Sequence, residues 1–286
     1  MIHINTTPLA FYTRLDRQSH RLSYAHGGVY SLICSTSKLL PFQIIVGADF
    51  PVIVAIILRD IHGTQIRDLT TFFSTTELLR KSFTDYDLLI YLGTTSLSPI
   101  IPEGLYYLEI QTASETLYSD VFNAVTTVQA SEIVGITYWD NEDFIFQHTP
   151  GRLVYTDNYR SKIYLPTKLA KPDYKIEEVV EDRDGFKFVE KQIQKKIFRF
   201  SFLAPEYICD VMSLVGMHDN IIITHNNKIY TIYDILFTPT WTDDGFLANV
   251  DAEFTTDAVI KKIGRLFPKH NLGDFNTDFN TDFNVI

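Results

Sequence analysis

The chain has 286 residues, of which 45% are hydrophobic and 14% aromatic, and this apolar content excludes a globally disordered protein. The formal net charge of -10 gives a surface that repels phosphate backbones, which argues against sequence-specific nucleic-acid binding. The 21 Phe and 16 Tyr favour pleated, half-buried surfaces, so the composition predicts a β-rich fold.

The cysteine content and the apolar runs argue against a disulfide-rich, secreted or membrane-spanning protein. The two cysteines, Cys34 and Cys209, are too few for a disulfide framework and too far apart for a zinc site, so each is interpreted as a small buried hydrophobe. No basic segment followed by an apolar core marks a secretory signal at the N-terminus. The longest apolar run, residues 50–58, is far shorter than the ~20 residues of a membrane span, so no span is expected.

Residues 1–128 read as short strands separated by turn signals. The predicted strands, rich in β-branched and aromatic residues, are 42–46, 51–58, 87–92 and 105–112. A short helix is predicted over 74–83, because Ser74 and Glu77 have the spacing of a capping box ahead of two leucines. The segment predicts a β-sandwich domain of immunoglobulin-like size.

Residues 124–132 lose their large apolar side chains and are the predicted linker to a second domain, residues 133–264. In this domain Phe198, Phe200 and Phe202 alternate with polar residues, which is the pattern of a strand. A helix is predicted next, beginning at Pro205 and ending at Gly216. Its apolar face consists of Ile208, Val211, Met212 and Val215.

The rest of the second domain reads as strands again. A hairpin is predicted across residues 225–227, and Asp-Gly turns are predicted at 184–185 and 244–245. In the last strand the residues expected to face inward are Phe246, Ala248, Val250, Ala252 and Phe254. The predicted fold class is therefore mainly β with some α: an N-terminal β-sandwich followed by an α+β domain of antiparallel sheet plus one helix.

Motifs for nucleotide binding, nucleophilic hydrolysis and zinc proteolysis do not occur in the sequence. His218 and His225 flank a predicted strand without a carboxylate pattern around them, so no metal site is assigned to them. The acidic run at 177–182 is interpreted as a solvated loop or a guard on an edge strand. We expect no catalytic residues, no cofactor, no metal and no enzymatic activity.

Trp139 and Trp241 leave two interpretations open. Each could stack on a sugar ring if it is exposed beside polar side chains, or each could anchor a small core as a buried aromatic residue. The first interpretation supports a glycan-binding protein, either a receptor-binding part of a virion or a bacterial surface protein.

The chain ends in a repeated Asp-Phe-Asn-Thr unit within a predicted extended arm, residues 265–286. In an extended chain one face of the repeat is apolar and the opposite face carries only Asp and Asn, because a four-residue period is an even number. Such a segment could add to the sheet edge of a neighbouring subunit, or it could trail unpaired. A calcium site is disfavoured because the Asp and Asn side chains do not converge. The predicted partner-docking residues are Phe275, Phe279, Phe283 and Val285.

A set of core and turn residues between 190 and 260 carries a resemblance. They are Pro205-Glu206, Asp210, His218-Asp219, Tyr230, Trp241 and the strand DGFLANVDAEF. This pattern resembles a module in virion proteins of Bacteroidetes phages, including crAss-like phages, where it occurs among tail and connector genes. The resemblance implies a structural subunit of a phage tail or neck, arranged as a ring, and it supplies no catalytic residues.

Together these observations predict a structural subunit of a phage tail or neck. It would form a homo-oligomeric ring in the virion, after assembly in the host cytoplasm, and dock to other tail or neck proteins through its C-terminal arm. The alternative is the glycan-binding protein described above, and a polysaccharide hydrolase ranks last.

Overall fold

The computed structural model describes residues 7–13, 30–74, 78–141, 145–147, 152–183, 186–242 and 246–262. It is mainly β with some α, which confirms the predicted fold class. The chain divides into two compact units: unit 1 is Met1–Ala170 with Arg199–Phe254, and unit 2 is Lys171–Phe198 with Thr255–Ile286. The domain boundaries expected from the sequence remain a prediction.

Two sheets form the first part of unit 1. The larger sheet has β8 at its centre, antiparallel to β4, β9 and β10, while β10 pairs in parallel with β2. Its described strands are β1 Phe11–Tyr12, β2 Leu32–Ser35, β4 Ile53–Asp60, β5 Gln65–Asp68, β8 Gly104–Thr112, β9 Thr116–Ser119 and β10 Phe122–Val125. The smaller sheet is antiparallel, in the order β3 Phe42–Gly47, β7 Tyr86–Tyr91 and β6 Leu78–Ser82.

Aromatic rings join these two sheets. The ring centroids of Phe11 in the larger sheet and Phe42 in the smaller sheet lie 4.7 Å apart, and Tyr91, the strand partner of Phe42, lies 5.3 Å from it. The opposite face of the smaller sheet is also covered, because Leu88 and Ile90 pack against Tyr155 from later in the chain. Burial on both faces explains why β3 and β7 read as nearly continuous apolar runs.

The helix predicted over 74–83 is wrong. The structure has a short helix, α2, at Thr70–Phe72, and the strand β6 covers Leu78–Ser82. The hydroxyl of Ser74 donates to the carbonyl of Thr71 at 3.1 Å, so Ser74 closes the preceding turn instead of beginning a new helix. Pairing of β6 with β7 then outweighs the local helix signal.

The predicted linker at 124–132 contains regular structure. It holds the end of β10 and a six-residue helix, α3 Thr127–Glu132. Thr126 and Gln129 form a capping box at the start of this helix: the Thr126 hydroxyl accepts from the backbone N–H of Gln129, and the Gln129 side chain accepts from the backbone N–H of Thr126.

The next sheet of unit 1 is antiparallel, and the predicted helix is confirmed. Its order is β14 Ser161–Leu165, β11 Val134–Trp139, β17 Asn220–His225 and β18 Lys228–Ile232, and a separate hairpin joins β12 Ile145–Gln147 to β13 Arg152–Val154. The helix α4 runs over Glu206–Val215, and the four predicted apolar residues are buried. The predicted hairpin between β17 and β18 is confirmed, with Asn226 and Asn227 at φ 48° and 60°.

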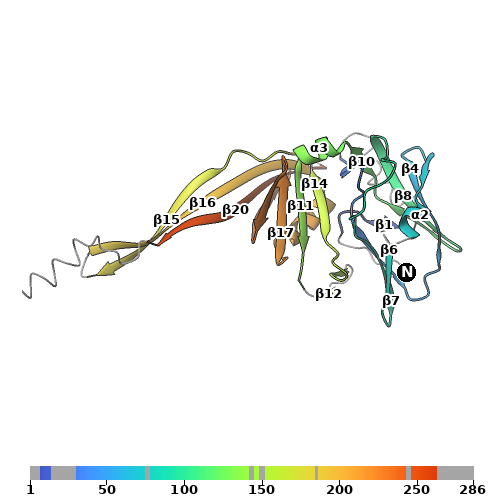
Figure 1. Cartoon of the computed structure of the whole chain (residues 1–286), viewed down its shortest axis with the longest axis horizontal. Helices are drawn as coiled ribbons and strands as arrows, with labels where there is room; N and C mark the ends of the chain where they lie inside the picture. Colours follow the sequence, from blue (N-terminus) through green and yellow to red (C-terminus); the bar gives the residue numbers. More distant parts are fainter. Residues whose placement is uncertain are drawn as a thin grey trace, which may run out of the picture. The chain divides into compact units, whose positions relative to one another are not determined.

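The last sheet has the order β15 Asp173–Arg183, β16 Phe186–Ala204, β20 Ala248–Lys262 and β19 Ile235–Thr240. Figure 1 shows β15, β16 and β20 running side by side. The inward positions predicted for β16 and β20 are buried, but Phe246 is exposed ahead of β20, so that part of the prediction is wrong. The predicted turns at 184–185 and 244–245 lie outside the described residues.

Candidate functional site

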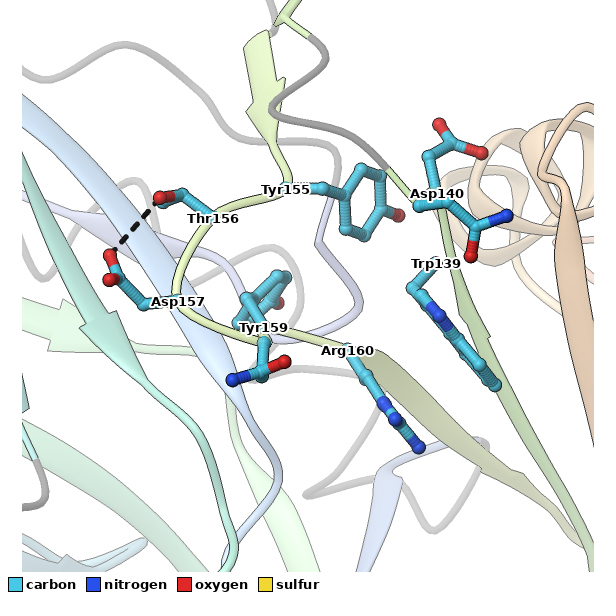
Figure 2. Close-up of a pocket in the computed structure, with 9 residues that line it drawn as sticks. Trp139, Asp140, Tyr155, Thr156, Asp157, Tyr159 and Arg160 are labelled. Atoms are coloured by element: carbon cyan, nitrogen blue, oxygen red, sulfur yellow. Dashed lines mark hydrogen bonds between the residues drawn. The ribbon is translucent and has the colours of Figure 1, made fainter.

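A pocket of about 450 Å³ lies on unit 1 and is shown in Figure 2; we name it the Trp139 pocket. Its volume falls within the range of small-molecule sites. It is lined by Trp139, Asp140, Asn141, Tyr155, Thr156, Asp157, Asn158, Tyr159 and Arg160. The lining therefore combines aromatic rings with carboxylate, amide, hydroxyl and guanidinium groups.

Two segments supply this lining, and strand pairing brings them together. Tyr138 at the end of β11 pairs with Ser161 at the start of β14. In an antiparallel ladder the next residues along, Trp139 and Arg160, therefore face each other one step beyond the last β11–β14 pair. The Arg160 guanidinium lies 4.1 Å from the centre of the Trp139 ring, a cation–π contact, and Figure 2 shows the two side chains lying alongside each other.

A tight turn forms the other wall. Asp157 and Asn158 both have positive φ, 53° and 62°, and the N–H of Tyr159 donates to the carbonyl of Thr156 at 2.9 Å. Two consecutive residues in the left-handed region define a type I′ turn, which Asp and Asn tolerate better than other residues with a side chain. The local sequence thus sets the wall's conformation.

Buried aromatic residues and a lysine fix this turn in place. Tyr155 and Tyr159 flank it and are buried against Ile45, Leu88 and Ile90 of the smaller sheet. Lys81 of β6 contacts the hydroxyl of Thr156 and forms an ion pair with Asp157 at 3.6 Å. The turn is therefore held from both its apolar and its polar side.

Tyr155 also connects the pocket to helix α4. Its hydroxyl lies 2.6 Å from Nε2 of His218, and Nδ1 of His218 lies 2.7 Å from the carbonyl oxygen of Leu214. Because a carbonyl only accepts, Nδ1 donates and Nε2 accepts from Tyr155. Burial raises the pKa of the Tyr155 hydroxyl far above its usual range and lowers the pKa of His218, so both groups are neutral.

The remaining rim is held by residues at the start of β17. Oδ1 of Asp140 accepts from the backbone N–H of Asp219 at 2.9 Å, and the Asn220 amide donates to Oδ1 of Asn141 at 2.7 Å. Figure 2 shows Asp140 and Asp157 on opposite sides of the pocket. These carboxylates do not form a close pair.

A second candidate surface lies on unit 2. We name it the ribbon: β15 with the paired part of β16, Asp173–Arg183 against Phe186–Ile197. Tyr174, Ile176, Val179 and Val180 on β15 are 60%, 64%, 46% and 44% exposed. Within the described residues β15 pairs with β16 alone, so its outer edge is open.

The acidic run at 177–182 lies on this edge strand. Glu177 accepts from Lys195 on β16 at 2.7 Å and lies 3.5 Å from Lys175 on its own strand. The ion pair with Lys195 lowers the pKa of Glu177. This position agrees with the interpretation of the run as a guard on an edge strand.

Sequence reasoning found part of the Trp139 pocket. Trp139 was a candidate, whereas the roles of Asn158 and Arg160 were missed because only the pairing of β11 with β14 places them beside it. Trp241 is 46% exposed but does not line this pocket. The predicted docking residues Phe275, Phe279, Phe283 and Val285 lie outside the described residues.

Over the part of the chain that the structure describes, no group of three or more His, Cys, Asp or Glu side chains is arranged to hold a metal ion. No helix within that part has the length and apolar content needed to cross a bilayer. Comparisons with protein-family models, with curated proteins and with solved structures give no match.

Proposed function

We propose that this protein is a structural subunit of a phage tail or neck, which forms a homo-oligomeric ring and contacts its neighbours in the virion. The observation that carries the proposal is the ribbon, whose apolar side chains are exposed and whose strand β15 has only β16 as a partner strand within the described residues. Because β16 also pairs with β20, β15 is the edge strand of this sheet. Burial of its exposed apolar side chains against a neighbouring subunit would stabilise the contact.

The edge of the ribbon suits a repeated contact between subunits. An open edge can accept a further strand through backbone hydrogen bonds, with alternate side chains supplying specificity. A contact between this edge and a different surface of the next copy is heterologous, and heterologous contacts form a ring when the rotation between successive copies closes. The resemblance of residues 190–260 to phage virion proteins adds support for the setting in a tail or neck.

The test is a comparison of two double variants by mass photometry. Tyr174→Ser/Ile176→Ser removes two exposed apolar side chains of the ribbon. Tyr233→Ser/Leu236→Ser removes a matched pair from unit 1, where these residues are 77% and 65% exposed. We expect a discrete oligomer for the wild-type chain and the control, and smaller species for the ribbon variant.

Circular dichroism of each variant would check that the sheets still form. A wild-type chain that stays monomeric at every concentration would contradict the proposed homo-oligomeric ring. An oligomer that survives equally in both variants would show that the ribbon does not carry the contact.

A further inference from the structure

We propose that the Trp139 pocket is a binding site for a neutral saccharide. The site lies within unit 1 and does not depend on the proposed ring, so the two proposals succeed or fail separately. The argument rests on the pocket's volume, on the chemistry of its lining and on the way its walls are fixed before any ligand arrives.

The volume and the mixed lining suit a sugar ring. A saccharide has apolar C–H faces and hydroxyl groups that both donate and accept hydrogen bonds. The walls carry the aromatic residues Trp139, Tyr155 and Tyr159, while Asn141 and Asn158 supply amides that donate and accept in the same way. An entirely apolar ligand would leave these polar groups unpaired, which costs affinity.

The charges of the lining favour a neutral ligand. Asp140 and Asp157 each contribute a carboxylate, and these are offset by the guanidinium of Arg160 and by Lys81 beside Asp157. The net charge of the whole chain is negative, at -10. An anionic ligand would meet two carboxylates and no excess of positive charge, whereas neutral hydroxyls can donate to the carboxylates.

Arg160 is positioned to donate hydrogen bonds to such a ligand. Its guanidinium lies over the Trp139 ring, 4.1 Å from the ring centre, and this contact limits its conformations. A guanidinium carries its N–H donors around its edge, so a stacked arginine still presents donors to a ligand beside the ring. The cost of ordering this long side chain is therefore met before binding.

The opposite wall is similarly fixed. The type I′ turn at Asp157 and Asn158 is held by Lys81 and by the buried Tyr155 and Tyr159. A site whose polar groups are already in place loses less entropy on binding than a flexible loop does. These contacts distinguish the Trp139 pocket from an accidental surface hollow.

The experiment begins with the full chain on a glycan array, followed by titration of the best soluble neutral glycan into a Trp241→Phe background. Trp139 is then the only tryptophan, so its fluorescence reports directly on the pocket. We expect a saturable change in emission on addition of the glycan.

The decisive variants are Asn158→Gly and Asn227→Gly. Both positions have positive φ, 62° and 60°, so glycine is tolerated by each turn, but only Asn158 lines the pocket. Loss of the Asn158 amide should weaken binding about tenfold, the usual effect of one lost hydrogen bond, while Asn227→Gly should bind as the parent does.

Three results would overturn the proposal. The first is an array without a bound glycan, and the second is an array on which only sialylated or sulfated glycans bind, since those ligands are anionic. The third is equal affinity in Asn158→Gly and the parent, which would place the glycan elsewhere on the chain.

Discussion

At the scale of single residues, the contact between Tyr155 and His218 links a pocket wall to helix α4. The tyrosine donates to Nε2 of the histidine, whose other ring nitrogen donates to Leu214. Both partners are buried, so neither hydrogen bond can be replaced by solvent without local opening. No metal site is assigned to His218 from the sequence, and the structure gives this residue a specific hydrogen-bonding role in the core.

This contact predicts that acid destabilises the fold. Burial lowers the pKa of His218 below its ordinary value of 6.5, so between the folded and unfolded pKa values the unfolded chain binds more protons. The free energy of unfolding should therefore keep its full value above about pH 6.5 and should decrease as the pH drops through that value. Urea unfolding over a series of pH values would measure the change.

The variant His218→Gln provides the control for this prediction, because it should lose less stability on acidification than the wild type. His225, whose pKa burial also lowers, accounts for a further part of the dependence. A slope between pH 7 and pH 5 that is the same in His218→Gln and the wild type would contradict the assignment to His218.

At the scale of elements, the sequence predicts the helices and strands in which apolar residues recur with the period of the buried face. The helix α4 was identifiable because Ile208, Val211, Met212 and Val215 recur at helical spacing and all face the core. The strand at 198–202 was identifiable because its phenylalanines alternate with exposed residues. The helix expected over 74–83 failed because its capping signal is local, whereas pairing with β7 is a long-range contact.

The Trp139 pocket also depends on long-range strand pairing, which local sequence signals do not predict. A tryptophan beside acidic residues can be singled out from sequence, but its cationic neighbour cannot. Trp139 and Arg160 meet only because Tyr138 pairs with Ser161, and this register depends on the whole antiparallel ladder between β11 and β14.

The helix α3 offers a test at this scale, since the sequence indicated a linker where the structure has a capped helix. Thr126→Ala removes the side-chain acceptor of the capping box and should lower the free energy of unfolding by about 1 kcal/mol. Val128→Ala, a change at an exposed position of the same helix, should stay within about 0.5 kcal/mol of the wild type. Equal stability of the two variants in urea unfolding would show that the capping box contributes nothing to stability.

At the scale of the whole molecule, assembly could use two separate features, the ribbon and the C-terminal arm. The arm, residues 265–286, lies outside the described residues, and its role is a prediction from the Asp-Phe-Asn-Thr repeat. If it docks as a strand, each buried phenylalanine would contribute about 1.5–3 kcal/mol to the contact. A chain ending at Gly273 should then dissociate at concentrations at which the full chain is oligomeric.

Substitutions on the two faces of the repeat make this prediction specific. Phe275→Ser/Phe279→Ser/Phe283→Ser removes the apolar face and should reproduce the truncation in mass photometry. Asp274→Asn/Asp278→Asn/Asp282→Asn changes the polar face alone and should leave the oligomer intact, because the phenylalanines still fill their pockets. An oligomer that persists without the arm but is lost in the Tyr174→Ser/Ile176→Ser variant would assign the subunit contact to the ribbon and leave the repeat without a role in self-association.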